Sequence, residues 1–155
     1  MTPELLAQIQ LLMVPMKPVI AQILRGTTLV EMAAVERERG RYDEAVRILD
    51  EALVLAKPFA PLTGQVLVEK GEVELALERP TRAMVLYEAA LPVARQVADL
   101  GLQARIFRGM AKVHSQQGQA EQAAEYLERA EALGPAGQEN PACRLPTSIF
   151  ELPPP

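Results

Sequence analysis

Apolar residues recur along the middle of the chain at spacings of three and four, which places their side chains on one face of a helix. The segment GRYDEAVRILDEAL shows this most clearly, because Ala45, Leu49 and Ala52 form a single stripe. From residue 134 onward the helical periodicity ends and Pro is frequent, so an extended tail is expected. The pattern predicts an all-α chain of seven helices over residues 3–14, 19–39, 42–56, 61–77, 81–98, 101–117 and 120–133.

Three segments of the chain superpose at offsets of 38 and 40 residues, which indicates an internal repeat built from two helices. Small residues recur on the first helix, where they let two helices approach closely. Gly40 and Gly118 suit a helix end in the left-handed conformation and predict the turn inside a hairpin. The middle copy departs from this, with Glu78 and Pro80 at the Gly and Tyr positions. The equivalent sets are Ala33, Gly71 and Ala111 on the first helices, and Leu49, Tyr87 and Leu127 on the second helices.

This order of small residue, Gly-x-Tyr, Ala, aromatic residue or Leu, and Ala, closed by Pro135 in the third copy, resembles the tetratricopeptide repeat family. The family's usual period is 34, so the excess length is expected at the junctions LAKPFAP and ARQVADLG as an extra helical turn. The resemblance implies a right-handed α-solenoid. It divides the chain into a single domain over residues 1–137, with an N-terminal helix and repeats at about 19–58, 59–98 and 99–137, and a Pro-rich tail over 138–155.

Charge and composition narrow the classes of partner. The formal net charge of -4 offers no overall positive field for nucleic acid or for an anionic membrane surface. Pro15 and Pro18 interrupt the most apolar stretch, so membrane insertion is not expected. A single cysteine, Cys143, cannot form an internal disulfide, and a cytoplasmic location is therefore expected.

The sequence contains no recognisable catalytic or metal-binding motif, whether a phosphate-binding glycine loop, HExxH, CxxC or GxSxG. Its one histidine, His114, is interpreted as a packed or half-exposed residue of a first helix. We therefore expect no enzymatic activity, no metal and no cofactor.

The first helices line the concave surface of such a solenoid, where ligands of the family commonly lie. Arg105, Arg108 and Lys112 are spaced by three and four residues, so their charges share one face and could hold an acidic or C-terminal carboxylate group. The alternative is that these cations form an ordinary solvated face. The other expected groove residues are Arg37 and Glu72, with an apolar floor of Val30, Ala34, Val68 and Leu75.

Both terminal segments carry apolar residues that lie outside the three repeats. The N-terminal helix is expected to pack as a half repeat, with a homodimer surface as an additional possibility; its apolar residues are Leu5, Ile9, Leu12, Met13 and Met16. In the tail, Ile149, Phe150 and Leu152 suggest a docking peptide, the alternative being a disordered terminus.

The leading functional hypothesis is a non-catalytic adaptor or scaffold that binds a partner protein or peptide in the groove or through the apolar N-terminal helix. The alternative is a regulatory domain that senses a peptide or ligand in a bacterial signalling or transcription system, since similar long repeats occur in bacterial regulatory proteins.

Overall fold

The computed structural model describes residues 2–13 and 16–134, which are built from helices without any strand. Six of the seven helices begin within one residue of the predicted positions. The helices are α1 Pro3–Met13, α2 Met16–Glu38, α3 Tyr42–Ala56, α4 Ala60–Ala76, α5 Pro80–Gln96, α6 Leu100–Gln116 and α7 Ala120–Ala132.

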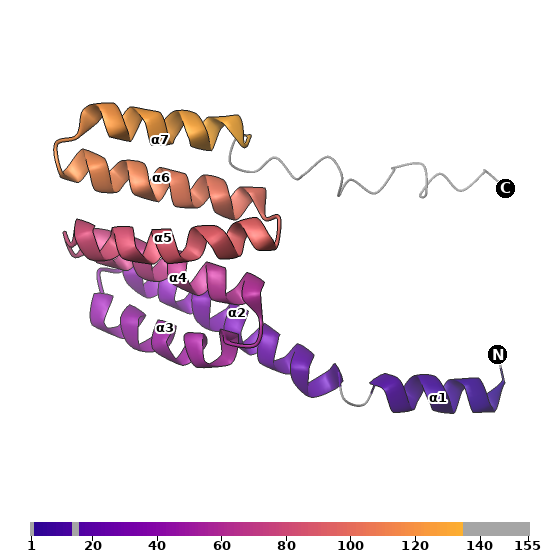
Figure 1. Ribbon diagram of the computed structural model, residues 1–155. Helices are drawn as coiled ribbons and strands as arrows, with labels where there is room; N and C mark the ends of the chain where they lie inside the picture. The colour runs from indigo at the N-terminus through magenta and orange to yellow at the C-terminus, as the bar shows by residue number, and fades with distance from the viewer. Residues whose placement is uncertain (1, 14–15, 135–155) are drawn as a thin grey trace, which may run out of the picture.

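The helices α2 to α7 form three antiparallel hairpins that stack in chain order (Figure 1). Within each hairpin the first helix packs on the second, and α2, α4 and α6 also contact one another in sequence. The second helices α3 and α5 pack on the following first helices, α4 and α6. The three first helices therefore lie side by side, and we call the surface they share the first-helix face.

The turn inside each hairpin has the same backbone conformation. Gly40 and Gly118 have φ values of 74° and 75°, as the sequence predicted. Glu78 occupies the equivalent place with φ 57°, although it is not glycine. In all three turns the next residue donates its backbone N–H to a carbonyl five positions earlier, the closing bond of a helix-ending Schellman turn: Arg41 to Glu36, Arg79 to Glu74 and Gln119 to His114.

The core is held by close contacts between small and large residues. Tyr87 of α5 is fully buried, and its ring lies against Gly71 of α4 and Gly109 of α6. A Cβ added to Gly71 would lie 2.8 Å from Tyr87 Cε1, closer than real Cβ contacts. The predicted role of Gly71 in helix approach is therefore confirmed, and one aromatic ring joins repeats 2 and 3.

The unequal repeat offsets arise inside one helix. The connections 57–59 and 97–99 are equally long, whereas α3 has 15 residues and α5 has 17. The two extra residues of α5 therefore account for the change in offset from 38 to 40. They lengthen the helix at ARQVADLG, one of the two junctions where excess length was expected.

The start of α2 and the place of α1 differ from the predictions. The α2 helix begins at Met16, three residues before the predicted start. Pro18 does not prevent this, because it lies in the first turn, where proline removes no helical hydrogen bond. In the repeat alignment the first residue of α4 corresponds to residue 22 of α2. Residues 16–21 therefore form an overhang that α4 does not have, and they are exposed. This overhang carries α1 away from α3 and α4 (Figure 1), so the expected packing of α1 as a half repeat is wrong.

The α2 helix is also long and apolar enough, by length and composition alone, to cross a membrane. Much of its length nevertheless packs on α3 and α4 as the first helix of repeat 1. Its buried face includes Gly26, Val30 and Ala33.

Candidate functional site

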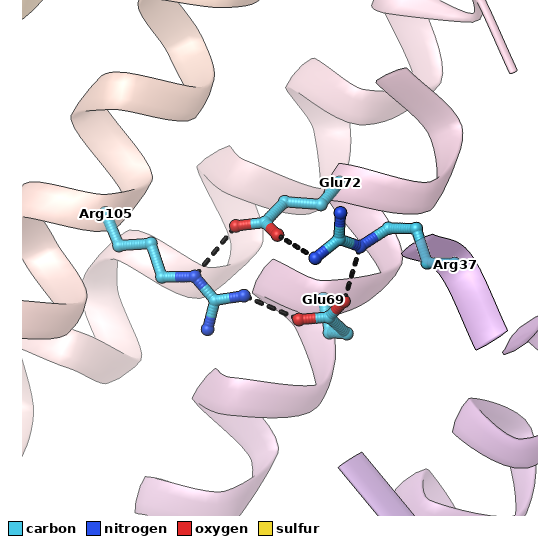
Figure 2. Close-up of polar contacts among 4 residues, drawn as sticks. All are labelled: Arg37, Glu69, Glu72 and Arg105. Atoms are coloured by element: carbon cyan, nitrogen blue, oxygen red, sulfur yellow. Dashed lines mark hydrogen bonds and ion pairs between the residues drawn. The ribbon is translucent and has the colours of Figure 1, made fainter. Parts of the chain in front are cut away.

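Four charged side chains from all three repeats form a closed ring on the first-helix face (Figure 2). Arg37 of α2 donates from Nε to Glu69 Oε1 over 2.7 Å, and its Nη2 lies 3.1 Å from Glu72 Oε2. Arg105 of α6 donates from Nη2 to Glu69 Oε2 over 2.5 Å and from Nε to Glu72 Oε1 over 2.7 Å. Each arginine thus contacts both carboxylates of α4, and each carboxylate uses both oxygens.

The ring is largely removed from water. The side chain of Glu69 is only 1% exposed, while those of Arg37 and Arg105 are 23% and 37% exposed. Burial alone would lower the pKa of Arg105, but hydrogen bonds and charges from Glu72 and Glu69 outweigh it and raise that pKa. Burial alone would also lower the pKa of Arg37, but the hydrogen bond to Glu69 outweighs it, so that pKa is raised as well. Both arginines stay charged, so the ring's two positive and two negative charges cancel.

The hydroxyl of Tyr87 lies among these charges without a hydrogen-bond partner within the described part of the chain. Burial raises the pKa of Tyr87 first, and the charge of Glu72 raises it further. The phenol therefore stays neutral, and it contributes packing to this site rather than an acid or base.

The ring changes the expected role of Arg105. The sequence placed its charge with those of Arg108 and Lys112, ready for a ligand carboxylate. Two glutamates of the same chain already occupy its guanidinium. Arg37 and Glu72, expected as groove residues, belong to the same ring. The prediction of three available cations is therefore corrected: Arg105 is paired within the chain, and Arg108 and Lys112 remain.

Arg108 and Lys112 lie one helical turn apart on α6. Arg108 is half-buried and Lys112 is exposed. Neither has an ion-pair partner among residues 2–13 and 16–134. They are the members of the predicted cation set that the structure leaves accessible beside the ring, and their role in binding stays a prediction.

The predicted apolar floor lies mostly in the core instead. Val68 is fully buried, and Val30 and Leu75 are 8% and 7% exposed. Neighbouring helices cover these side chains, so they cannot line an open groove, and this part of the prediction is corrected. Ala34 is half-buried.

The N-terminal residues expected at a dimer surface are exposed: Leu5, Ile9, Leu12 and Met16 are between 39% and 72% accessible. The side chain of Met13 and the tail residues Ile149, Phe150 and Leu152 lie outside the described residues. Self-association and tail docking both stay predictions.

His114 lies near the end of α6 and has a packing environment. Its ring stacks on Tyr126 of α7 with centroids 5.2 Å apart and planes 10° apart. Its Nδ1 lies 2.5 Å from Gln119 Oε1. These contacts fit the interpretation of His114 as a half-exposed structural residue.

Sequence reasoning missed Glu69 as the centre of the site. The sequence held one signal for it: Glu69 lies on an apolar helix, and a carboxylate that becomes buried there needs cationic partners. Its partners lie 32 and 36 residues away along the chain. Only the three-dimensional stacking brings them together.

Comparison with known proteins supports the repeat assignment. The tetratricopeptide repeat model matches residues 24–96 and again residues 62–136, which together cover most of the chain. No curated protein matches the sequence. Members of this family are typically non-catalytic modules that mediate protein–protein interactions. With three stacked helical hairpins and these matches, the chain belongs to the tetratricopeptide repeat family.

Proposed function

We propose that the chain is a non-catalytic adaptor that binds an acidic segment of a partner protein at the α6 end of the first-helix face. One observation carries the proposal: Arg108 and Lys112 lie on one side of α6 beside a ring whose charges cancel. Within the described part of the chain, no carboxylate pairs with either cation. The family's general role in protein interactions supports the same class of function.

The chemistry of the two cations favours carboxylate ligands. A guanidinium can bind a carboxylate through two parallel hydrogen bonds. Arg108 is half-buried, which restricts its side chain and reduces the conformational entropy lost on binding. Lys112, one turn away, adds a second positive charge for the next acidic residue or for a terminal carboxylate. Because Glu69 and Glu72 are committed to Arg37 and Arg105, they do not compete for these cations.

The rest of the surface restricts which partners suit this site. The chain has a net charge of -4, so acidic partners gain attraction only at a local basic spot. Binding should therefore weaken as salt is added, because the contact is partly exposed. A cytoplasmic location, expected from the single cysteine, belongs to the same proposal.

Affinity capture with charge-reversed variants tests the proposal. Tagged wild-type chain and the double variant Arg108→Glu/Lys112→Glu would be incubated with native cell extract, and bound proteins quantified by mass spectrometry. A matched control, Arg82→Glu/Arg95→Glu, makes the same change in net charge at two exposed cations of α5.

We expect the specific partner to be lost by about tenfold or more with the α6 variant and retained by the control. Equal recovery by wild type and the α6 variant would show that these cations form only a solvated face. Loss with both variants would show a dependence on overall charge rather than on this site.

A further inference from the structure

The outer side of α2 carries a stacking face that no helix covers in the described structure. We define the α2 stacking face as Leu24, Thr28, Met32 and Val35, which follow one another at spacings of four and three. Leu24, Met32 and Val35 are 62%, 49% and 44% exposed. A shallow hollow of about 320 Å³ lies over part of this face, lined by Thr28, Met32 and Val35 and bordered by Glu31, Glu36 and Arg39.

The internal repeat shows what these positions do elsewhere. Offsets of 38 and 40 residues relate Leu24 to Leu62 and Leu102, and Val35 to Val73 and Val113. These four counterparts are at most 6% exposed. Thr28 corresponds to Val66 and Ile106, which are fully buried. Met32 corresponds in repeat 3 to Met110, which is 3% exposed, and in repeat 2 to Lys70, which is half-buried and pairs with Asp50 of α3.

The counterparts are buried because a preceding helix covers them. Leu62 and Val66 share a core cluster with residues of α3, and Leu102 and Ile106 share one with residues of α5. Within residues 2–13 and 16–134, α1 is the helix that precedes α2, and it does not pack along this surface, so the surface lacks the cover that α3 and α5 give to repeats 2 and 3.

The chain's own α1 cannot supply that cover. Only two residues separate α1 from α2, so a folded-back α1 would start alongside Met16. Both helices rise about 1.5 Å per residue, and the 11 residues of α1 would therefore reach only to about Gly26. Met32 and Val35 would stay exposed.

We infer that the α2 stacking face binds the same face of a second copy in an antiparallel, two-fold-related pair. A crossing near Thr28 sets Leu24 of one copy opposite Met32 of the other, with the small Thr28 at the centre. This surface lies apart from Arg108 and Lys112, and the inference does not rest on the proposed function.

Charge along α2 favours the antiparallel direction. Residues 16–27 contain two cations, Lys17 and Arg25, and no acid; Arg25 pairs with Glu51 of α3, so Lys17 is the cation of this half that has no ion pair among the described residues. Residues 28–38 contain three glutamates and Arg37, whose guanidinium is committed to the ring. Glu36 pairs with Arg39 and Arg41, so Glu31 and Glu38 are the acids of this half without an ion pair among the described residues. An antiparallel pair sets the positive half of each helix against the negative half of the other, and it brings Lys17 near Glu38 of the second copy. A parallel pair would oppose like charges.

Head-to-tail stacking of α7 on α2 suits this surface less well. The exposed glutamates of α7 include Glu128 and Glu131. Glu131 occupies the position held by the apolar Leu53 in repeat 1 and Leu91 in repeat 2. Stacking would place its carboxylate against apolar side chains, which is unfavourable without a partner. Such contacts would also build open chains rather than a closed pair.

Analytical ultracentrifugation of the full chain tests the inference. Wild type should sediment as a species of twice the 17.0 kDa monomer mass. Met32→Glu should weaken association by roughly 100-fold or more, because an unpaired carboxylate would be buried. The control Val85→Glu changes a 61% exposed valine on α5 and should leave the dimer intact. Circular dichroism would show that both variants remain folded.

Charge variants test the direction of pairing, and cysteine variants test its centre. Lys17→Glu should weaken the dimer by bringing like charges together, and Lys17→Glu/Glu38→Lys should restore it. With Cys143 replaced by Ser, Thr28→Cys should form an intermolecular disulfide on oxidation, whereas Val85→Cys should not.

Several results would overturn the inference. A wild-type monomer at all concentrations, a dimer unaffected by Met32→Glu, or a series of ever larger species would each contradict the closed pair. Flotation of monomeric wild type, but not of Met32→Glu, with phosphatidylcholine and phosphatidylglycerol vesicles would assign the face to a membrane instead.

Discussion

Arg105 Nη2 donates a hydrogen bond to Glu69 Oε2 over 2.5 Å, joining residues 36 positions apart. Glu69 is almost fully buried, and this bond and the matching one from Arg37 provide a partner for each of its two carboxylate oxygens. The contact ties the first helix of repeat 3 to that of repeat 2, and Arg37 ties repeat 1 to the same carboxylate. The centre of the first-helix face is therefore a link between repeats.

Removing the central carboxylate should strongly destabilise the chain. Glu69→Ala leaves two partly buried guanidiniums short of an acceptor, and we expect a loss of about 3–5 kcal/mol in the free energy of unfolding. Urea denaturation followed by circular dichroism measures it. Glu88→Ala, an exposed site on α5, should change the free energy by less than about 0.5 kcal/mol. Similar small effects at both sites would contradict the structural role of the ring.

Tyr87→Phe should stabilise the chain or leave its stability unchanged. The hydroxyl is buried among charges with no hydrogen-bond partner in the described residues, so its removal relieves a desolvation cost of about 1 kcal/mol. The thermal midpoint would rise in a melting experiment. A clear fall would mean that the hydroxyl makes a stabilising bond.

Gly109→Ala should destabilise repeats 2 and 3 together. The added methyl group would overlap the fully buried ring of Tyr87, and such overpacking costs about 1–3 kcal/mol. Gly101→Ala is the control, because a Cβ there would meet only Asp99 at 3.5 Å. Urea midpoints compare the two variants, and equal midpoints would argue against the close contact.

The hairpin turns predict opposite effects for two substitutions. Glu78→Gly should stabilise the chain by about 1 kcal/mol, because Glu78 has a φ of 57° that glycine adopts without strain. Gly40→Ala should cost a similar amount at the equivalent turn. Thermal unfolding of both variants tests the turns, and a destabilised Glu78→Gly would contradict the strain.

The repeat architecture could be predicted because its signals are local. Helical spacing is visible in the order of residues, and Gly40 and Gly118 predict the left-handed turn conformation that they adopt. Glu78 shows the limit of this reasoning, since its left-handed conformation follows from its place between two packed helices rather than from its own preference.

The site was harder to predict because its contacts cross repeats. Helical spacing alone put Arg105 on one face with Arg108 and Lys112, and it could not tell which guanidinium would meet a buried carboxylate from α4. The same limit applies to Val68, which is buried in a core cluster with residues of α5 and α6. The exposed position of α1 depends on the overhang of α2, which Pro18 permits.

Hydrogen exchange on the complex tests directly whether a partner binds the α6 end of the first-helix face. With the partner recovered by affinity capture, amide exchange would be measured by mass spectrometry in the free and bound chain. We expect partner-induced protection to concentrate in α6, around Arg108 and Lys112, with little change in the outer helices α3 and α5. Protection confined to α3 and α5, with α6 unchanged, would contradict it.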